Sequence, residues 1–327
     1  MKQNTPQWHY SLSHAVTCLQ TLCDLLDITI NDMTHLQPIE KSFAFRVPRE
    51  FVARMEKRNP RDPLLLQVLP QMAESLPGES FSTDPLHELQ QNPVPGILHK
   101  YSGRVLLTLT GACAIHCRYC FRRHFPYESN FPGQENWQKI LNYIADHPTI
   151  EEVILSGGDP LLLSDQKLAE CVSQLENISH VERLRIHTRL PVVIPSRVTD
   201  DWVAWMKQSR LLIIVVLHIN HPNEIDDAVI LACKHLKTAN ITLLNQSVLL
   251  KNINDCADTL IQLSKKLFQA GVLPYYLHLL DKVQGAAHFD VDETTAEALM
   301  SVIKAQLPGF LVPKLAREVA GHPNKRY

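Results

Sequence analysis

Short apolar runs alternate with amphipathic helical segments along the last two-thirds of the chain. The apolar runs span residues 104–110, 151–157, 182–188, 211–219, 241–250 and 272–280. Each is typical of a β-strand, and a helical pattern follows each one. Trp137, Ile140, Leu141 and Ile144 share one face of the helix expected after the first strand, and Asn223 is expected to cap the fourth helix. Repeated β-α units predict a parallel sheet that right-handed crossovers curl into a barrel or partial barrel.

The first 95 residues follow a different pattern. They carry amphipathic helical stretches separated by proline-rich joints, without a convincing series of strands. The segment QNPVPG at 91–96 contains Pro93 and Pro95, which would break a helix and mark a boundary. We therefore expect an α/β protein with a helical N-terminal region over residues 1–95 and a partial (β/α)6 barrel over residues 96–327.

Charge and hydropathy exclude several classes of partner. Lys and Arg number 32 against 34 Asp and Glu, so the net charge of −2 creates no field that would draw the chain onto nucleic acid or an anionic membrane. The longest aliphatic run, 211–217, is too short to span a bilayer, and the polar start lacks a secretory signal. We expect a cytoplasmic protein, in which closely spaced cysteines bind metal rather than form disulfides.

The eight cysteines fall into two groups. Five stand at helical spacing among apolar residues and are expected to pack in the core. These five are Cys18, Cys23, Cys171, Cys233 and Cys256. The other three, Cys113, Cys117 and Cys120, are crowded into the eight-residue stretch CAIHCRYC directly after the first predicted strand. No core helix requires that spacing, so these three are candidate metal ligands.

Three thiolates are one fewer than a structural zinc site or an ordinary iron–sulfur cluster needs. A 4Fe–4S cluster on Cys113, Cys117 and Cys120 would leave one iron open for another ligand. Zinc, with His116 or His124 as the fourth ligand, is the alternative, although neither histidine has the usual finger spacing.

Polar residues and glycines follow every predicted strand at the same end. They lie at 156–160, 187–189, 218–222, 245–247 and 281. Loops of any barrel are polar, so each segment alone is weak support for a site. Catalytic groups of a barrel gather where strands end, and the convergence of these segments on the cysteine motif predicts an active site there.

The C-x3-C-x2-C spacing resembles that of the radical S-adenosylmethionine superfamily. Gly157, Gly158 and Asp159 match its second-strand motif, where backbone groups approach the methionine part of the cofactor. The segments CRYCFRRHF, SGGDPL, HTRLPVVIPSRVT, HINHPNE and LLNQSVLLKNIND, in this order, resemble the lysine 2,3-aminomutase family from about residue 40 onward. This resemblance implies a TIM-like partial barrel of the radical SAM type. It also implies a 4Fe–4S cluster, S-adenosyl-L-methionine and pyridoxal 5′-phosphate as cofactors.

The resemblance also places a catalytic lysine near the C-terminus. In the family, pyridoxal phosphate is held by a lysine in a proline- and glycine-containing segment, which corresponds to Gly321-His322-Pro323-Asn324-Lys325. Lys325 is therefore the Schiff-base candidate. His322 and Asn324 stand where longer members have glycines, so the pattern is only partly kept. From the residues alone, Lys325 would be interpreted as a solvated terminal lysine.

Three further residues match the family's substrate contacts. Arg122 corresponds to the arginine that grips the substrate carboxylate, a task that suits the bidentate guanidinium. Asp281 corresponds to an aspartate that receives the distal ammonium of lysine. Glu318 stands where the family has a second such aspartate. Without the resemblance, either carboxylate could be an ordinary surface group.

Four other residues are candidate cofactor contacts. Lys100 and Arg104 match cationic positions that contact pyridoxal phosphate, and Gln246 matches another active-site contact. Arg189, at the end of the third predicted strand, completes the set. Taken individually, Lys100 and Arg104 could also be solvated charges.

The resemblance implies an isomerase that moves the α-amino group of L-lysine to the β-carbon through an adenosyl radical. The stretch at 45–70 and Glu318 resemble the short branch, which makes (R)-β-lysine for translation elongation factor P. The partners implied are a β-lysine ligase and a reductant such as flavodoxin or ferredoxin. The alternatives are a catabolic enzyme that makes (S)-β-lysine, an iron–sulfur carrier or binding protein without this activity, a polar pyridoxal enzyme, and a radical enzyme for another substrate.

Overall fold

The computed structural model describes residues 6–29, 43–130, 133–322 and 324–326. Its centre is a single eight-stranded sheet in the order β1 to β8, in which β1 is antiparallel to β2 and every other pair is parallel. The strands are β1 Ile97–Tyr101, β2 Arg104–Thr110, β3 Glu152–Gly157, β4 Arg183–Thr188, β5 Leu212–His218, β6 Thr242–Val248, β7 Leu273–His278 and β8 Lys314–Ala316. The first and last strands are not paired with each other, so the curved sheet is an open, partial barrel.

Strands β2 to β7 correspond to the six apolar runs of the sequence, which confirms the predicted α/β fold. The two edge strands were not predicted. β1 is short and belongs to a hairpin that turns at Ser102 and Gly103, while β8 has only three residues. Neither is long enough for an apolar alternation to stand out from its surroundings.

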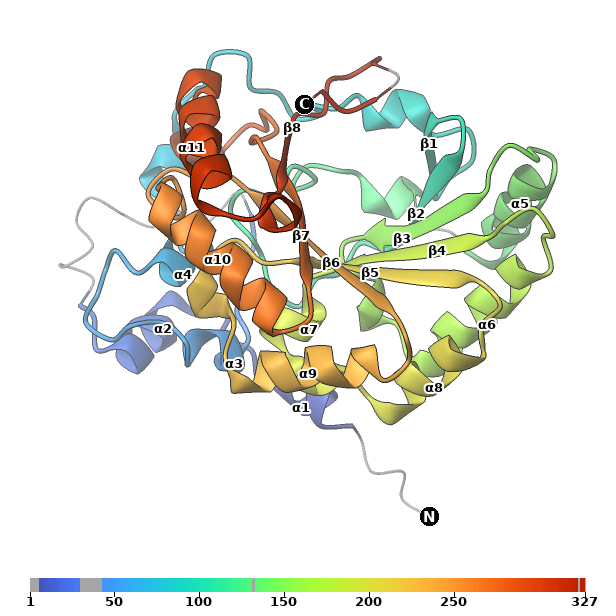
Figure 1. Ribbon diagram of the computed structural model, residues 1–327, viewed down its shortest axis with the longest axis horizontal. Coiled ribbons are helices and arrows are strands. Elements are labelled where there is room, and N and C mark those ends of the chain that lie inside the picture. Colours follow the sequence, from blue (N-terminus) through green and yellow to red (C-terminus); the bar gives the residue numbers. More distant parts are fainter. Residues whose placement is uncertain (1–5, 30–42, 131–132, 323, 327) are drawn as a thin grey trace.

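Helices follow the strands and cover the outer side of the sheet (Figure 1). They are α5 Gln134–Ala145, α6 Asp165–Glu176, α7 Leu190–Val193, α8 Asp200–Gln208, α9 Asp227–Lys237, α10 Ala257–Gln269 and α11 Glu293–Gln306. Ile140 and Ile144 of α5 are fully buried, as the helical pattern predicts. The expected cap at Asn223 is wrong: Asn223 lies in a 3-10 turn, and the Asp226 side chain accepts the backbone N–H of Val229 at the start of α9.

The N-terminal region consists of short helices and turns. They are α1 Gln7–Ser13, α2 Leu19–Leu26, α3 Arg49–Val52, α4 Pro63–Leu66 and the 3-10 turns η2 Met72–Ser75 and η3 Glu88–Gln91. Trp8, Leu22 and Leu64 belong to the same buried cluster as Val105 of β2. Apolar packing thus continues across residue 95, and the division of the chain at that point stays a prediction.

The cysteines expected in the core divide unequally. Cys23, Cys171 and Cys233 are buried, as predicted. The prediction is wrong for Cys18 and Cys256, which are exposed. Each stands at the N-cap position of its helix, α2 or α10, where the chain has not yet entered the apolar stripe.

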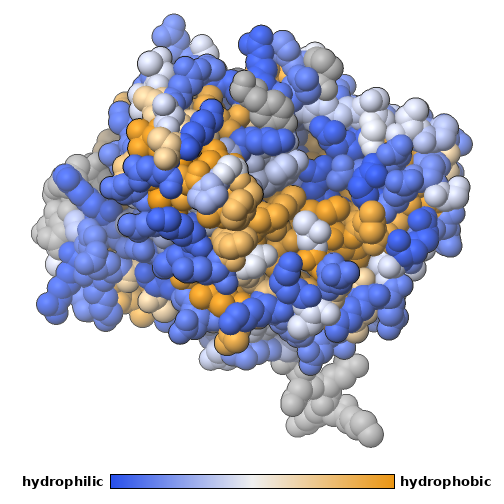
Figure 2. All heavy atoms as spheres, viewed as in Figure 1, coloured by the Kyte–Doolittle hydropathy of each residue, from blue (hydrophilic) through white to orange (hydrophobic). Residues whose placement is uncertain are grey.

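The N-terminal ends of the strands carry exposed apolar residues. Leu212 begins β5 and is 67% exposed, and Leu273 begins β7 and is 40% exposed. Figure 2 shows apolar side chains gathered across the middle of the face in view, within a hydrophilic surround. The three cysteines, Asp159, Arg189 and Asp281 follow the opposite strand ends, whereas Lys100 and Arg104 lie at the β1–β2 hairpin. Among the helices of the described segments, none has both the length and the apolar character that a membrane span requires.

Candidate active site

One cavity of about 740 Å³ lies inside the curved sheet. Strand register sets part of its wall, because Leu106, Ile154, Arg185 and Ile214 are neighbours on adjacent strands and all line it. Every site residue expected from the sequence also lines this cavity. They are Lys100, Arg104, Cys113, Cys117, Cys120, Arg122, Gly157, Gly158, Asp159, Arg189, Gln246, Asp281, Glu318 and Lys325. The structure therefore brings them together, while their individual roles stay predictions.

The loop that carries the three cysteines is fastened to the N-terminal region. The backbone N–H of Arg118 donates to the carbonyl of Gln67 at 2.9 Å. The buried guanidinium of Arg118 donates to both carboxylate oxygens of Glu74, at 2.8 and 2.5 Å, and Arg123 donates to the same carboxylate at 2.7 Å. Such charge-assisted bonds hold the loop in one geometry. Sequence reasoning missed this role of Gln67 and Glu74, because their surroundings look like ordinary helix.

Gly157 and Gly158 let the end of β3 pack against the start of the cysteine loop. Gly157 has a φ of +117°, which disfavours a side chain, and a Cβ on Gly158 would lie 2.2 Å from the carbonyl oxygen of Ala112. The N–H of Gly158 donates to the Thr110 carbonyl at 2.7 Å. These glycines thus permit a close approach within the chain, and their approach to a cofactor stays a prediction.

Asp159 is buried and organises the next turn. Its carboxylate accepts the Thr188 hydroxyl at 2.7 Å and the backbone N–H groups of Arg189, Leu190 and Leu161 at 2.8, 3.0 and 3.1 Å. Burial raises the pKa of this carboxyl, and these donors oppose the shift. The side chain therefore holds the end of β4 beside the cysteine loop.

The three cysteines of the loop are half-buried, and one strong hydrogen-bond donor reaches them. Burial raises the pKa of Cys113 well above its ordinary value and that of Cys120 to about 11, so iron would have to displace the thiol protons. The Nη1 atom of Arg189 donates to the Sγ atom of Cys117 at 2.7 Å. Arg189 Nη2 is paired with Glu224 at 2.9 Å, which fixes the direction of this donor.

The zinc alternative finds no support in the positions of the two histidines. His116 Nδ1 is bonded to the Ala44 carbonyl at 2.9 Å, and His124 Nε2 to the Gln284 carbonyl at 3.1 Å. Within the described segments, no three His, Cys, Asp or Glu side chains converge as ligands of a single ion. A 4Fe–4S cube needs no such convergence, because each thiolate binds its own iron.

A row of five alternating charges runs along the cavity wall. Glu88 accepts Arg122 Nε and Nη2 at 2.7 and 2.9 Å, and Lys100 Nζ lies 3.1 Å from the same carboxylate. Lys100 is also paired with Glu318 at 2.8 Å, and Glu318 with Lys325 at 3.0 Å. Glu88 was not expected from the sequence, because it belongs to the N-terminal region and has no strand-end position to mark it.

The two carboxylates expected to bind the distal ammonium differ in charge. Burial and the neighbouring charge of Glu318 raise the pKa of Asp281 to about 7, against the opposing effect of Lys325 and Lys100. Burial also disfavours ionisation of Glu318, but Lys325 and Lys100 lower its pKa to about 2. Glu318 is thus a permanent anion, whereas Asp281 can gain or lose a proton near neutrality.

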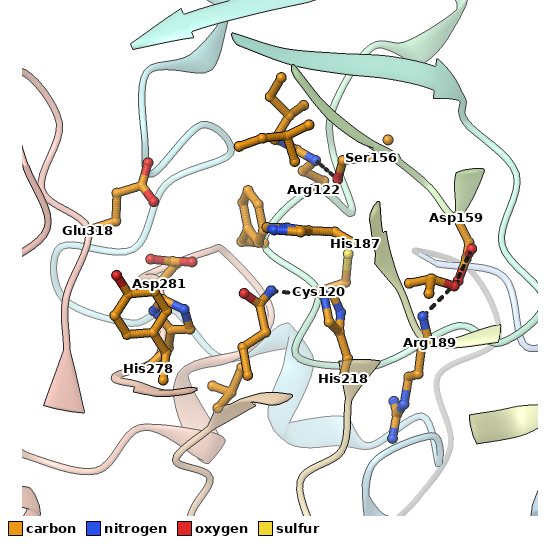
Figure 3. Close-up of a pocket in the computed structure, with 18 of the residues that line it drawn as sticks. Cys120, Arg122, Ser156, Asp159, His187, Arg189, His218, His278, Asp281 and Glu318 are labelled. Atoms are coloured by element: carbon orange, nitrogen blue, oxygen red, sulfur yellow. Dashed lines mark hydrogen bonds between the residues drawn. The ribbon is translucent and has the colours of Figure 1, made fainter. Parts of the chain in front are cut away.

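Figure 3 shows Asp281 and Glu318 on one side of the cavity and Asp159 and Arg189 on the other, with Cys120 between them. This arrangement places the acidic pair away from the turn that Asp159 organises.

Two buried nitrogens on the cavity wall lack a hydrogen-bond partner within the described part of the chain, His187 Nε2 and Arg189 Nε. Unsatisfied buried donors or acceptors are costly, so they indicate where a polar ligand belongs. Gln246 bonds to His218 Nε2 at 2.8 Å, and burial lowers the pKa of His218 to about 3 and that of His187 well below its usual value. Together with the thiols and Lys325, these groups fit the expected cofactors.

Comparison with known proteins agrees with this site. Residues 107–263 match the model of the Radical SAM superfamily. The chain is 52% identical to the L-lysine 2,3-aminomutase of Haemophilus influenzae, over 97% of this chain and 94% of that protein. It is 51% identical to that of Escherichia coli over 98% and 95%, and 33% identical to that of Clostridium subterminale over 97% and 76%. The chain therefore belongs to the radical SAM lysine 2,3-aminomutase family, whose members are isomerases that use a 4Fe–4S cluster, S-adenosylmethionine and pyridoxal phosphate.

Proposed function

We propose that this chain converts L-lysine to (R)-β-lysine and that the product serves the modification of translation elongation factor P. The observation that carries the aminomutase part of this proposal is that one cavity holds three thiols, a lysine amine, a cation for the carboxylate of lysine and carboxylates for its ammonium. Neither an electron carrier nor a binding protein without catalysis needs the lysine and the acidic pair.

Substrate recognition follows from the charges at the two ends of lysine. Arg122 would bind the α-carboxylate, because a guanidinium matches a carboxylate with two parallel hydrogen bonds. Asp281 would receive the distal ammonium, which stabilises its ionised form, and Glu318 would add negative charge beside it. Leucine has no distal ammonium, so it would form no ion pair with Asp281 and would leave this buried carboxyl without a partner.

The protein positions and shields the reacting groups. When bound, the cluster and S-adenosylmethionine supply a hydrogen-abstracting radical, and pyridoxal phosphate allows an amino group to move between neighbouring carbons. Cys113, Cys117 and Cys120 would hold the cluster. Lys325 would hold pyridoxal phosphate through its Nζ atom, and the curved sheet around the cavity would keep water away from the radical.

Four residues would complete the cofactor sites. Lys100 and Arg104 would hold the anionic pyridoxal phosphate, for which they supply fixed positive charge. Arg189 would fix the cluster through its bond to Cys117 at 2.7 Å. Gln246, on β6, reaches the same space beside His218.

Assignment to the elongation factor P branch rests on resemblance. The chain is 51–52% identical to the Escherichia coli and Haemophilus influenzae relatives and 33% identical to the clostridial one. It also has Glu318 where longer members have aspartate, and it carries the stretch at 45–70 typical of the short branch. A separate ligase would consume the β-lysine, and a flavodoxin or ferredoxin would supply the electron. These partners place the reaction in the cytoplasm.

The test is anaerobic incubation of the reconstituted protein with L-lysine, S-adenosylmethionine, pyridoxal phosphate and a reductant, followed by chiral separation of the product. We expect (R)-β-lysine, and no rearrangement of leucine under the same conditions. (S)-β-Lysine would assign the chain to the catabolic branch instead. Absence of any β-lysine from protein with a full cluster and bound pyridoxal phosphate would reject the aminomutase proposal.

A further inference from the structure

Glu88 is a buried anion of the cavity wall that comes from outside the β/α units. It begins the turn η3 (Glu88–Gln91), and its side chain is only 4% exposed. Its backbone N–H donates to Asp84 Oδ1 at 3.0 Å, which fixes the start of the turn. Arg122 and Lys100 outweigh the effect of burial and lower the pKa of Glu88, so the carboxylate is ionised.

Glu88 occupies only one edge of the Arg122 guanidinium. A guanidinium can bind one carboxylate through Nε and one terminal nitrogen, and another through its two terminal nitrogens. Glu88 accepts from Nε and Nη2, whereas Nη1 donates to the Ser156 hydroxyl at 3.2 Å. Glu88 and Ser156 thus engage three of the five N–H groups, which leaves one on each terminal nitrogen to receive a second carboxylate while Glu88 stays in place.

The charge balance of the wall favours an added anion at that edge. Arg122, Lys100 and Lys325 are cations, and they alternate with the anions Glu88 and Glu318. A carboxylate next to Arg122 would extend the alternation at the end of the row opposite Lys325, the residue that the proposed function assigns to pyridoxal phosphate. Expelling Glu88 to make room would instead separate a buried anion from two cations, which is strongly unfavourable.

We propose that Glu88 is a positioning residue for the substrate carboxylate: it holds Arg122 by one edge, so that the other edge is aimed at the substrate, and it remains bound to Arg122 throughout. The inference rests on the proposed role of Arg122 and deepens it. Arg122 and Glu88 together would then recognise the α-carboxylate, and Glu88 is supplied by the N-terminal region.

Two ligands separate the contribution of the carboxylate from everything else. L-Lysine carries the α-carboxylate, while cadaverine is the same diamine chain without it. Both would place an ammonium at the acidic pair Asp281 and Glu318. The ratio of the two affinities therefore measures how strongly the Arg122 site binds the carboxylate. Changes elsewhere in the cavity affect both ligands equally and cancel in the ratio.

The experiment measures the affinity of both ligands by calorimetry on the complete protein with cofactors bound and the cluster oxidised, so that no turnover occurs. In Glu88→Ala we expect the lysine-to-cadaverine preference to fall roughly tenfold or more, the usual effect of removing a hydrogen-bonding partner of a charged group. Glu88→Gln, which keeps the shape and one acceptor oxygen, should fall between this variant and the parent. The matched control is Asp165→Asn, because Asp165 pairs with the buried Arg197 at 2.7 Å as Glu88 pairs with Arg122, and neither Asp165 nor Arg197 lines the cavity. It should leave the preference unchanged.

Three results would overturn the proposal. Tighter lysine binding in the Glu88 variants would mean that Glu88 competes with the substrate carboxylate. An equal loss for lysine and cadaverine would give Glu88 a general structural role only. If the parent protein binds cadaverine with the same affinity as lysine, Arg122 does not recognise the carboxylate, and Glu88 has no carboxylate-binding residue to position. By contrast, the parent protein could prefer lysine, lose this preference in the Glu88 variants and still form no β-lysine. That result would reject the proposed reaction and leave the role of Glu88 intact.

Discussion

The Nζ atom of Lys325 lies 3.0 Å from Oε2 of Glu318, although the two residues are separated by a reversal of the chain. Gly321 has a φ of +76° within this segment, and the backbones of Arg317 and Arg326 pair in an antiparallel bridge. The bridge carries the last part of the chain back over the cavity, so that a lysine almost at the end of the sequence reaches its interior. Pro323, within the expected segment, lies outside the described residues.

Replacing Lys325 by alanine should abolish covalent binding of pyridoxal phosphate. The protein holds the cofactor through this amine in our proposal, and the structure places the amine against Glu318 inside the cavity. We expect the reconstituted parent to show an imine absorbance band near the visible edge and the variant to lack it. The exposed Lys304 on α11 offers a matched control, and its replacement by alanine should leave the band unchanged. Persistence of the band in Lys325→Ala would mean that pyridoxal phosphate is attached to another lysine.

Replacing Cys117 by alanine should prevent formation of a complete 4Fe–4S cluster. The cluster would lose one of its three protein thiolates and the sulfur that accepts Arg189. Iron and sulfide content, together with electron paramagnetic resonance of the reduced protein, would measure the loss. Cys171→Ala is the control, because this buried cysteine packs on α6 in the core. It should cost some stability and keep the full cluster, and a complete cluster in Cys117→Ala would contradict the assignment.

The repeated part of the fold and the residues that follow strands could be predicted from the sequence. Each of the strands β2 to β7 carries a long apolar run, and chain order alone brings their ends together. The ion-pair partners could not be predicted. Glu74 and Glu88 lie in the N-terminal region, and their pairing with Arg118 and Arg122 depends on how that region folds back over the barrel. No periodicity encodes such a contact, because it joins isolated polar residues from two different kinds of segment.

Asp281 should make lysine binding depend on pH near neutrality. Its pKa is raised to about 7, so the ligand-free side chain is neutral at lower pH and becomes a carboxylate as the pH rises. The lysine ammonium stays charged throughout, and affinity should therefore rise by up to about tenfold per pH unit below this pKa and level off above it. Burial lowers the pKa values of the cavity histidines His187, His218 and His278, so these groups stay neutral in this range. Calorimetric titrations from about one and a half pH units below this pKa to the same distance above it would measure the profile.

Asp281→Asn provides the control for this profile. The variant should bind lysine weakly, with affinity that hardly changes over the same pH range. The stability of the ligand-free protein should change with pH in the opposite direction to its affinity for lysine. Because the folded-state pKa of Asp281 lies above the unfolded value, the unfolded chain releases this proton first, and the ligand-free parent loses stability relative to the variant as the pH rises toward about 7. A steep parent profile that persists in Asp281→Asn would assign the titration to another group.

The contact between Gly158 and the start of the cysteine loop predicts that even a methyl group there will disturb cluster binding. In Gly158→Ala the new Cβ would lie 2.2 Å from the carbonyl oxygen of Ala112 and 2.8 Å from the carbonyl carbon of Gly111. These are backbone atoms that cannot rotate away, so β3 and the loop must separate, at a cost of about 1–3 kcal/mol. The displaced segment leads directly into Cys113, and we expect lower iron content as well as a lower unfolding midpoint.

Gly309 offers the matched control for this substitution. A Cβ added to Gly309 would meet no atom within 4 Å, so Gly309→Ala should change stability by less than about 0.5 kcal/mol and leave the iron content at the parent level. Equal stability and iron content in both variants would show that the loop tolerates the movement. The glycine at position 158 would then be needed for something other than this close packing, such as the approach of a cofactor to its backbone.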